Sequence, residues 1–377
     1  MKKVIALAAF ALLTTATSAP LPEEERDAPL PHKPLDWMYH VRTAGKGKGF
    51  KEMYRLPLAS FYELLNGDGK SWTGLRRAIN AKAVGKKHHW RAYKGQTVPA
   101  EVRLAVTLRW LAGGAWQDLR SAYGCSRAEL FRTFWLVIDV INANLHNVHF
   151  PIDDRDELAK MEQLFAAKSR KGTWRGQVGA VDGCVLRTHN PGDSVPACKT
   201  WYVARKGCFG ILLQAIADAD RRIRWYDMNS VPTSHDSSAF TRSDLGQRIV
   251  NGDLPAPFFL SGDNAYKNGP SLVTPGVGTK YYHLNFEHSS LRMPIEQAFG
   301  ELVARWGILW RPLRMKHKRR AILIACLVRL HNWCIDHRIK SEFNEVNGMV
   351  GVERVPGALA EPVNEVKLVL EDGIQQP

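Results

Sequence analysis

The spacing of apolar residues changes at about residue 176, and this change limits the fold more than any other feature of the chain. From residue 51 to 150, apolar side chains recur at intervals of three and four, which is typical of amphipathic helices. After residue 176, short continuous apolar runs alternate with turn residues, which is typical of buried strands. We therefore predict an all-helical module over residues 51–150, followed by an α/β domain over residues 176–337.

Composition and charge narrow the class of protein. Of the 377 residues, 45% are hydrophobic and 24% are charged, which is ordinary globular usage and excludes a disordered or collagen-like chain. The 52 Lys and Arg against 37 Asp and Glu leave a net charge of +15, which favours nucleic acid as a partner before an anionic membrane surface. The six cysteines form no CxxC pair, which argues against a disulfide scaffold and against a zinc ribbon.

The two ends of the chain differ in composition from the rest. Residues 1–19 place two lysines before an apolar run and a group of small residues, which is the pattern of a secretory leader and too short to span a bilayer. Residues 20–50 start with many Pro, Glu and Asp and are predicted to be a linker. Residues 342–377 are acidic with few aromatic side chains and are predicted to be a disordered tail. A genuine leader would mean secretion, although nothing later in the chain resembles a secreted protein.

Part of the helical module has the order of a helix-turn-helix. A short helix is predicted over residues 116–123, Gly124 breaks it, and Ser126 can cap the helix that follows. The alternative interpretation is a plain helical bundle that packs on its neighbour. A basic cluster over residues 86–91 is either a loop that contacts phosphates or an ordinary solvated loop.

The order of elements after residue 176 indicates the fold class. We predict three strands, a helix and a further strand over residues 177–183, 209–217, 223–228, 238–250 and 258–260. The second and third strands are joined by a short turn and should be antiparallel. This is the element order of a ribonuclease-H-like fold, a mixed sheet with flanking helices.

Three carboxylates lie near the predicted ends of buried elements. Asp182 lies at the end of the first strand, and Asp263 follows the last one. Glu296 lies on a helix expected to start just before Pro294, because proline is tolerated in the first turn of a helix. The helix dipole would favour a carboxylate there. If the strands are neighbours and the helix crosses them, the three side chains converge. Each residue alone has an ordinary interpretation, as a turn or a solvated helix edge, so the prediction depends on all three together.

Converging carboxylates repel one another unless cations lie between them. Mg²⁺, or Mn²⁺, prefers a few carboxylate oxygens together with water and substrate phosphate. Two such ions can activate a water or a 3′-hydroxyl for attack on a phosphodiester. The positive net charge of the chain agrees with a polyanionic substrate.

Several short sequence motifs, called blocks below, support this interpretation, and their order along the chain is part of the evidence. They are Val181–Gly183, Tyr202–Gly207, Ser234–Ser237, Ser261–Tyr266, Asn285–Phe286, Ser289–Arg292, Ile295–Leu302 and Leu330–Asn332. With these blocks, the segment from Gly176 to Asp336 resembles the DDE endonuclease domain of PIF/Harbinger-type transposases and their domesticated relatives. The stretch from Leu104 to Tyr123 also looks like the helical region of that family.

The resemblance implies roles for particular residues. It places the family's metal-binding carboxylates at Asp182, Asp263 and Glu296, with Mg²⁺ as the usual cofactor and cleavage and joining of DNA strands as the activity. Asp236 lies in the Ser234–Ser237 block and is a weaker candidate, either a ligand itself or a carboxylate that supports the ligands.

Two blocks depart from the family pattern. Cys184 stands where a Thr-His pair is common, and Asn264-Ala265 stands where Ser-Gly is common. Neither departure removes a carboxylate, so they bear on the efficiency of the reaction more than on its chemistry.

Basic residues near these blocks are candidates for DNA contacts. One group follows the first strand and the other follows the Glu296 helix, so the candidates are Lys199, Arg205, Lys206, Arg311, Arg314, Lys316, Lys318, Arg319 and Arg320. Residues 316–320 also fit a nuclear import signal. The alternative interpretation of the second group is a solvated helix end.

The resemblance also implies partners and a location. The expected partner is DNA, both transposon ends and target, with a Myb-like DNA-binding protein and a second copy of the chain as further expectations and no membrane. The expected location is the nucleus, or outside the cell if residues 1–19 are a genuine leader. Two other functions remain open, a domesticated and catalytically silent DNA-binding protein and a secreted nuclease of the same fold.

Overall fold

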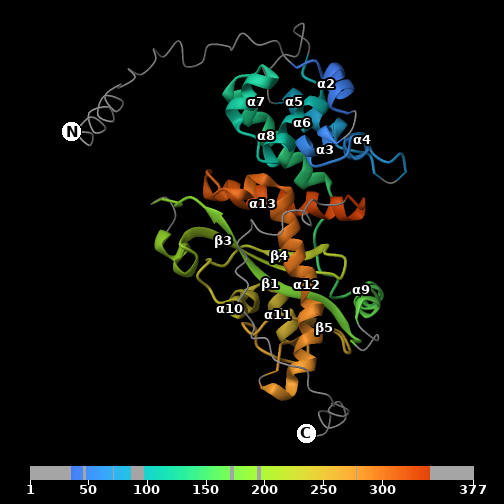
Figure 1. The fold of residues 1–377 in the computed structure, drawn as a ribbon, viewed down its shortest axis with the longest axis vertical. Helices are drawn as coiled ribbons and strands as arrows, with labels where there is room; N and C mark the ends of the chain where they lie inside the picture. The colour runs from blue at the N-terminus through green and yellow to red at the C-terminus, as the bar shows by residue number, and fades with distance from the viewer. Residues whose placement is uncertain are drawn as a thin grey trace, which may run out of the picture.

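The computed structural model describes residues 35–45, 48–70, 72–85, 97–169, 174–192, 197–276 and 278–339. Within these ranges a helical module packs on one end of an α/β domain, and helix α13 (His317–Asp336) lies between the two (Figure 1). No helix in the described ranges is long and apolar enough to cross a membrane. The predictions for residues 1–19, 86–91 and 342–377 fall outside the described residues.

The helical module begins earlier than predicted. Its helices are α2 (Trp37–Ala44), α3 (Gly49–Tyr54), α4 (Leu58–Asn66), α5 (Arg76–Gly85), α6 (Ala100–Leu111), α7 (Trp116–Tyr123) and α8 (Arg127–Asn144). The linker predicted over residues 20–50 is wrong in its last part, which forms α2 and the start of α3. Trp37 and Phe50 are buried there, and their rings lie 5.6 and 5.4 Å from the ring of Phe61. Helices this short give little periodic signal, and it is the aromatic packing on α4 that stabilises them.

The turn and the cap between α7 and α8 are confirmed. Gly124 ends α7 in the left-handed conformation, with φ 59°. Ser126 Oγ accepts a hydrogen bond from the Glu129 N–H at 3.2 Å. Most of α8 is buried, because it packs on both α6 and α13, while Arg127 and Arg132 near its start are exposed. This burial favours the bundle interpretation, and DNA reading by α8 stays a prediction.

The α/β domain is built on a mixed sheet, as predicted. Its strands are β1 (Gln177–Thr188), β2 (Tyr202–Val203), β3 (Cys208–Ala217), β4 (Ile223–Asp227), β5 (Phe259–Ser261) and β6 (Leu272–Val273). The strand order is β2-β3-β1-β5-β6, and β4 pairs with β3. The strand β3 is antiparallel to both of its neighbours β1 and β4, whereas β5 is parallel to β1 and β6 is parallel to β5.

The first strand is longer than predicted. The sequence pattern ends it at Gly183, whereas β1 continues to Thr188. Its ladder with β3 is unbroken from Ala180 to Thr188, because each residue there has a partner on β3. The Asp-Gly pair is therefore part of a strand and not a turn, since a long neighbouring strand satisfies the backbone hydrogen bonds.

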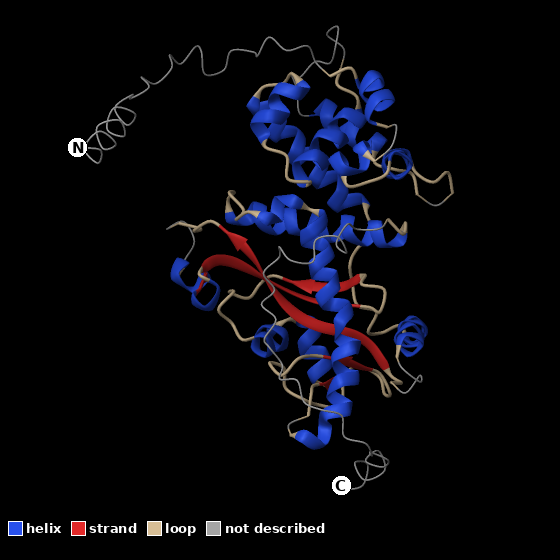
Figure 2. Ribbon diagram, viewed as in Figure 1, coloured by secondary structure: helices blue, strands red, loops and turns tan. Residues whose placement is uncertain are grey.

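Helices cover both faces of the sheet (Figure 2). Besides α13 they are α9 (Arg155–Lys168), α10 (Asp236–Arg242), α11 (Asp244–Val250) and α12 (Tyr282–Arg305). Side chains alternate along β1 between the two layers, so that Ala180 packs with α12 and α13 and Val181 packs with α9, α10 and α11. The helix predicted over residues 238–250 is divided at Ser243, whose hydroxyl accepts from the Gly246 N–H at 3.1 Å and caps α11.

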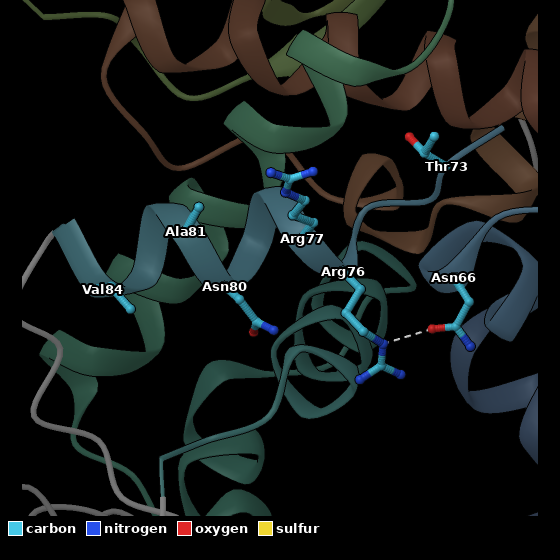
Figure 3. A pocket seen from close by; sticks show the side chains of 7 residues that line it. All are labelled: Asn66, Thr73, Arg76, Arg77, Asn80, Ala81 and Val84. Atoms are coloured by element: carbon cyan, nitrogen blue, oxygen red, sulfur yellow. Dashed lines mark hydrogen bonds between the residues drawn. The ribbon is translucent and has the colours of Figure 1, made fainter.

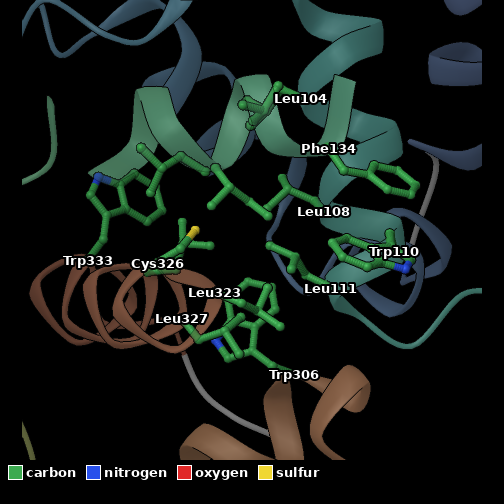
Figure 4. Close-up of a cluster of buried hydrophobic side chains, with 14 of the residues drawn as sticks. Leu104, Leu108, Trp110, Leu111, Phe134, Trp306, Leu323, Cys326, Leu327 and Trp333 are labelled. Atoms are coloured by element: carbon green, nitrogen blue, oxygen red, sulfur yellow. The ribbon is translucent and has the colours of Figure 1, made fainter. Parts of the chain in front are cut away.

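One hydrophobic core joins the helical module to the α/β domain. Figure 4 shows side chains of α6, α13 and the end of α12 gathered in this cluster, among them Leu108, Leu111, Leu323, Leu327 and Trp306. All five are fully buried. The module and the domain predicted as separate segments therefore share a core, with α13 contributing to both.

Candidate active site

The register between β1 and β5 brings the two aspartates together where β5 ends. Ala180 pairs with Ser261, the last residue of β5. Asp182 and Asp263 each lie two residues beyond this pair. Parallel strands in register place equivalent positions at the same height, and β5 ends here while β1 continues. Asp182 therefore lies beside the turn that carries Asp263, although it is in the middle of its strand and not at the predicted end.

The chain after β5 turns sharply at Asp263. Asp263 Oδ1 accepts from the Ala265 N–H at 2.9 Å, and its carbonyl accepts from the Tyr266 N–H at 3.1 Å. The same turn places the Tyr266 ring against Gly262, where a Cβ would lie 3.0 Å from the ring. The turn therefore holds Asp263 just after the end of β5 and packs the buried Tyr266 side chain against Gly262.

The Asp182 carboxylate is largely buried and has an unusual proton affinity. Burial is the main cause that raises the pKa of Asp182 to about 7. Arg292 and the Gly183 N–H, which donates to Asp182 Oδ1 at 2.7 Å, lower this pKa. The negative charges of Asp263 and Asp236 raise it further. Asp263 and Asp236 thus lie close enough to Asp182 to affect its ionisation.

Glu296 reaches the site from a longer helix than predicted. α12 begins at Tyr282 and contains Pro294, so the prediction of a helix start at Pro294 is wrong. Glu296 lies in the middle of the helix, and the helix dipole gives it no special stabilisation there. A proline inside a helix removes one backbone hydrogen bond, and the burial of Leu291, Ile295 and neighbouring residues keeps α12 helical across it.

Arg292 connects Glu296 with Asp182. Its Nη2 atom lies 3.0 Å from Glu296 Oε1 and 3.8 Å from Asp182 Oδ2. The Arg292 side chain is 14% exposed, whereas that of Glu296 is 51% exposed. The Arg292 guanidinium therefore lies between Glu296, the third predicted carboxylate, and Asp182.

Asp236 is held next to the site from the opposite face of the sheet. It is the first residue of α10, and its Oδ1 accepts from Gln214 Nε2 at 2.8 Å. The Tyr266 hydroxyl donates to Gln214 Oε1 at 2.8 Å, which orients the amide. Gly183, opposite Gln214 in the ladder, leaves the room for this contact, because a Cβ there would lie 2.2 Å from Asp236 Oδ1. Burial, followed by the charge of Asp263, raises the pKa of Asp236.

Sequence reasoning missed the roles of Gln214, Tyr266 and Arg292. A signal existed for Gln214, because it is the one polar residue in the apolar run of β3. Tyr266 and Arg292 lie inside two of the family blocks, yet no pattern in the sequence shows which carboxylates they approach. The contacts of Tyr266 with Gln214 and of Arg292 with Asp182 join positions far apart along the chain.

The aspartates fit a divalent cation chemically. They offer hard oxygen donors in a buried place, and their mutual repulsion is what a cation would relieve. In the described part of the chain, no three His, Cys, Asp or Glu side chains stand close enough together to hold a metal ion. A metal would therefore require side-chain rotation, above all of Glu296, which now pairs with Arg292.

The candidate DNA-binding residues near the first strand lie beside the site. The short helix η4 (Ala204–Lys206) carries Arg205 and Lys206, and both lower the pKa of Asp236, which places their charges near it. The preceding η3 (Cys198–Trp201) carries Lys199, which is exposed. The Trp201 ring lies 4.3 Å from that of His317 at the start of α13. The two groups of basic candidates are therefore neighbours.

The candidates around the start of α13 differ in exposure. The exposed ones are Arg311, Arg314, Lys316, Lys318 and Arg319. Arg320 is the exception, since it is 3% exposed. Its guanidinium donates to the carbonyls of Met315 and His189 at 2.9 and 3.1 Å. The prediction of a DNA contact for Arg320 is wrong, because this side chain ties α13 to the chain after β1.

A pocket in the helical module is separate from this site. Its lining residues, on and around α4 and α5, are Asn66, Thr73, Arg76, Arg77, Asn80, Ala81 and Val84 (Figure 3). Arg76 already pairs with Glu101 at 2.6 Å and with Asn66 at 2.7 Å. The pocket therefore adds nothing to the carboxylate site on the sheet.

The mixed sheet and its paired aspartates are those expected of a nuclease of the DDE type. Residues 181–332 match the family model described as DDE superfamily endonuclease. The matched segment contains Asp182, Asp263 and Glu296 and supports a transposase-derived nuclease domain of this type, as the resemblance implied. No curated protein and no solved structure matches the chain.

Proposed function

We propose that this protein is a DNA endonuclease and transposase of the Harbinger type, with a ribonuclease-H-like domain that uses two divalent cations. The observation that carries the proposal is the β1–β5 register, which sets Asp182 beside the turn that carries Asp263. The family match over residues 181–332 supports the nuclease class. The substrate is DNA, and the ions are Mg²⁺ or Mn²⁺.

In the proposed reaction the protein binds and orients a phosphodiester at the edge of the sheet. Asp182, Asp263 and Glu296 would hold the ions, which supply an activated water or 3′-hydroxyl and stabilise the leaving oxygen. The buried position of Asp182 keeps bulk water away from that side chain. Arg205 and Lys206 hold the DNA backbone next to the carboxylates by charge.

The partner and location follow from the same proposal. A transposase acts in the nucleus on transposon ends and target DNA, with a Myb-like DNA-binding protein and a second copy of the chain as partners. Secretion is the alternative location. A fluorescent fusion of the whole chain, imaged in cells beside a residue 20–377 version, separates the two: nuclear signal for both supports the proposal, and export of the whole chain contradicts it.

A catalytically silent DNA-binding protein is the second candidate. The observation in its favour is that Arg292, and not a third carboxylate, faces Asp182 in this conformation. Under this alternative the protein binds DNA and does not cleave it in either Mg²⁺ or Mn²⁺.

The proposal is tested by nicking of a supercoiled plasmid that carries the ends of the parent element. Wild-type protein should nick in Mg²⁺ or Mn²⁺ and stop in EDTA. Asp182→Asn and Asp263→Asn should abolish nicking, and Asp236→Asn should reduce it by about 10–100-fold, as for groups that orient metal ligands. DNA binding, measured by fluorescence anisotropy, should persist in all three variants.

A matched surface variant controls for the loss of charge. Asp253→Asn removes a carboxylate that pairs with Arg248 and is 44% exposed, and it should nick like the wild type. Equal nicking by Asp182→Asn and wild type would overturn the assignment of the site. DNA binding without nicking by the wild type would favour the silent alternative.

A further inference from the structure

The Arg292 guanidinium occupies the space between two predicted metal ligands. It is 3.0 Å from Glu296 Oε1 and 3.8 Å from Asp182 Oδ2. The Arg292 side chain is 14% exposed, so water screens its charge poorly. A cation already lies where the carboxylates would otherwise repel one another.

The surroundings of Asp182 show why a cation is needed there. The Asp182 side chain is only 19% exposed, and the β1–β5 register places it beside the turn that carries Asp263. In the described ranges, the ion pair to Asp182 comes from Arg292. Without Arg292, Asp182 would have no ion-pair partner among the described residues.

We propose that Arg292 is the resident counter-ion of the pocket, and that divalent cations bind in competition with its guanidinium. This inference rests on the proposed metal-dependent function and goes beyond it, because it assigns to Arg292 control over metal affinity. The guanidinium holds Asp182 and Glu296 in place while the metal is absent. It must leave Glu296 before that carboxylate can turn to a metal.

A purely structural role for Arg292 predicts the opposite effect. Arg292 and Glu296 are one helical turn apart on α12, and such pairs order each other's side chains. If Arg292 only positioned Glu296 as a ligand, its removal would weaken metal binding. If it competes with the metal, its removal strengthens binding, because a positive charge a few ångströms from the ion is lost.

The test is Mn²⁺ binding to the full-length protein without DNA, by titration calorimetry and by electron paramagnetic resonance of the free ion. Arg292→Gln should bind Mn²⁺ at least about tenfold more tightly than the wild type. Arg292→Met, which keeps the packing of the side-chain stem, should do the same. Arg292→Lys, which keeps the charge, should bind like the wild type. Arg132→Gln is the matched control, since it breaks a helical Arg–Glu pair in α8, and should change nothing.

Thermal unfolding gives a readout that does not require fine calorimetry. Removal of the Arg292 charge should make the protein less stable without Mn²⁺ and more stable with Mn²⁺ bound. The rise in Tm on addition of Mn²⁺ should therefore be larger in Arg292→Gln and Arg292→Met than in the wild type. Circular dichroism of each variant confirms that it is folded before titration.

The outcomes separate this inference from the proposed function. Mn²⁺ binding that is lost in Asp182→Asn but unchanged or weaker in both Arg292→Gln and Arg292→Met would overturn the inference alone. Absence of Mn²⁺ binding in the wild type and in both variants would overturn the proposed function, and the inference with it.

Discussion

At the residue scale, the burial of Asp182 governs the electrostatics of the candidate site. Its pKa is raised from an ordinary value of 3.8 to about 7, chiefly by burial. The folded protein therefore holds this proton more tightly than the unfolded chain does. Between about pH 4 and pH 7 the native state binds more protons than the unfolded state, so the free energy of unfolding falls as the pH rises through this window.

Replacement of Asp182 by Asn should remove this pH dependence. In EDTA at pH 8 we expect the Tm of Asp182→Asn to exceed that of the wild type by about 4 °C, since each kcal/mol moves the midpoint of a domain this size by about 2–4 °C. The difference should shrink toward pH 4, where wild-type Asp182 is protonated. Differential scanning calorimetry across this range measures it.

A control and a contrary result define this test. The Asp253→Asn variant, on the surface, should follow the wild-type Tm at pH 8. An Asp182→Asn variant that is less stable than the wild type at pH 8 without metal would show that the carboxylate is not destabilised by its surroundings.

At the element scale, local signals and tertiary contacts share control of the helices. The Ser126 hydroxyl satisfies a backbone N–H that the first turn of α8 would leave free. At Pro294 tertiary contacts override the local signal. Proline disfavours a helix interior, and the burial of one side of α12 stabilises the helix across it. A cap is thus readable from the chain, whereas the length of α12 is not.

Loss of the Ser126 cap should have a modest and defined cost. Ser126→Ala should lower the free energy of unfolding by about 1 kcal/mol, because the Glu129 N–H loses its acceptor. Urea denaturation followed by circular dichroism measures the change. Ser126→Asp also caps a helix and should stay near the wild type; an equal loss in both variants would point to packing and not to the cap.

At the scale of the whole molecule, the shared core makes the α/β domain depend on the helical module. Leu323, Cys326 and Leu327 of α13 are fully buried in the cluster that includes α6 and α8. Removal of the module would expose this apolar surface to water. Large exposed apolar surfaces lead to association.

We expect a protein of residues 151–339 alone to aggregate or bind a hydrophobic dye. Coexpression with residues 35–150 should restore a soluble complex, because the two pieces rebuild the core around α13. Size-exclusion chromatography and dye fluorescence measure both outcomes. A monomeric residue 151–339 protein that does not bind the dye would show that α13 needs no cover from the helical module.

The sequence alone determined the features that depend on neighbouring residues. Periodicity predicted the helical module and the β3 and β4 strands, and the Ser126 cap was readable from its residue type. The positions of Asp182 and Asp263 in their blocks were also visible in the chain, and the family match contains both. These signals are local, because backbone geometry and side-chain spacing act over a few residues.

Tertiary structure decided what depends on residues far apart in the chain. The pairing of Ala180 with Ser261 sets Asp182 beside the turn that carries Asp263, the Arg292 contact separates Glu296 from Asp182, and packing buries the Arg320 side chain. Strand register and the neighbours of a charge arise only when distant segments pack. The candidate carboxylates could therefore be identified from the sequence. Only the fold shows that Asp182 and Asp263 lie close together and that Arg292 lies between Asp182 and Glu296.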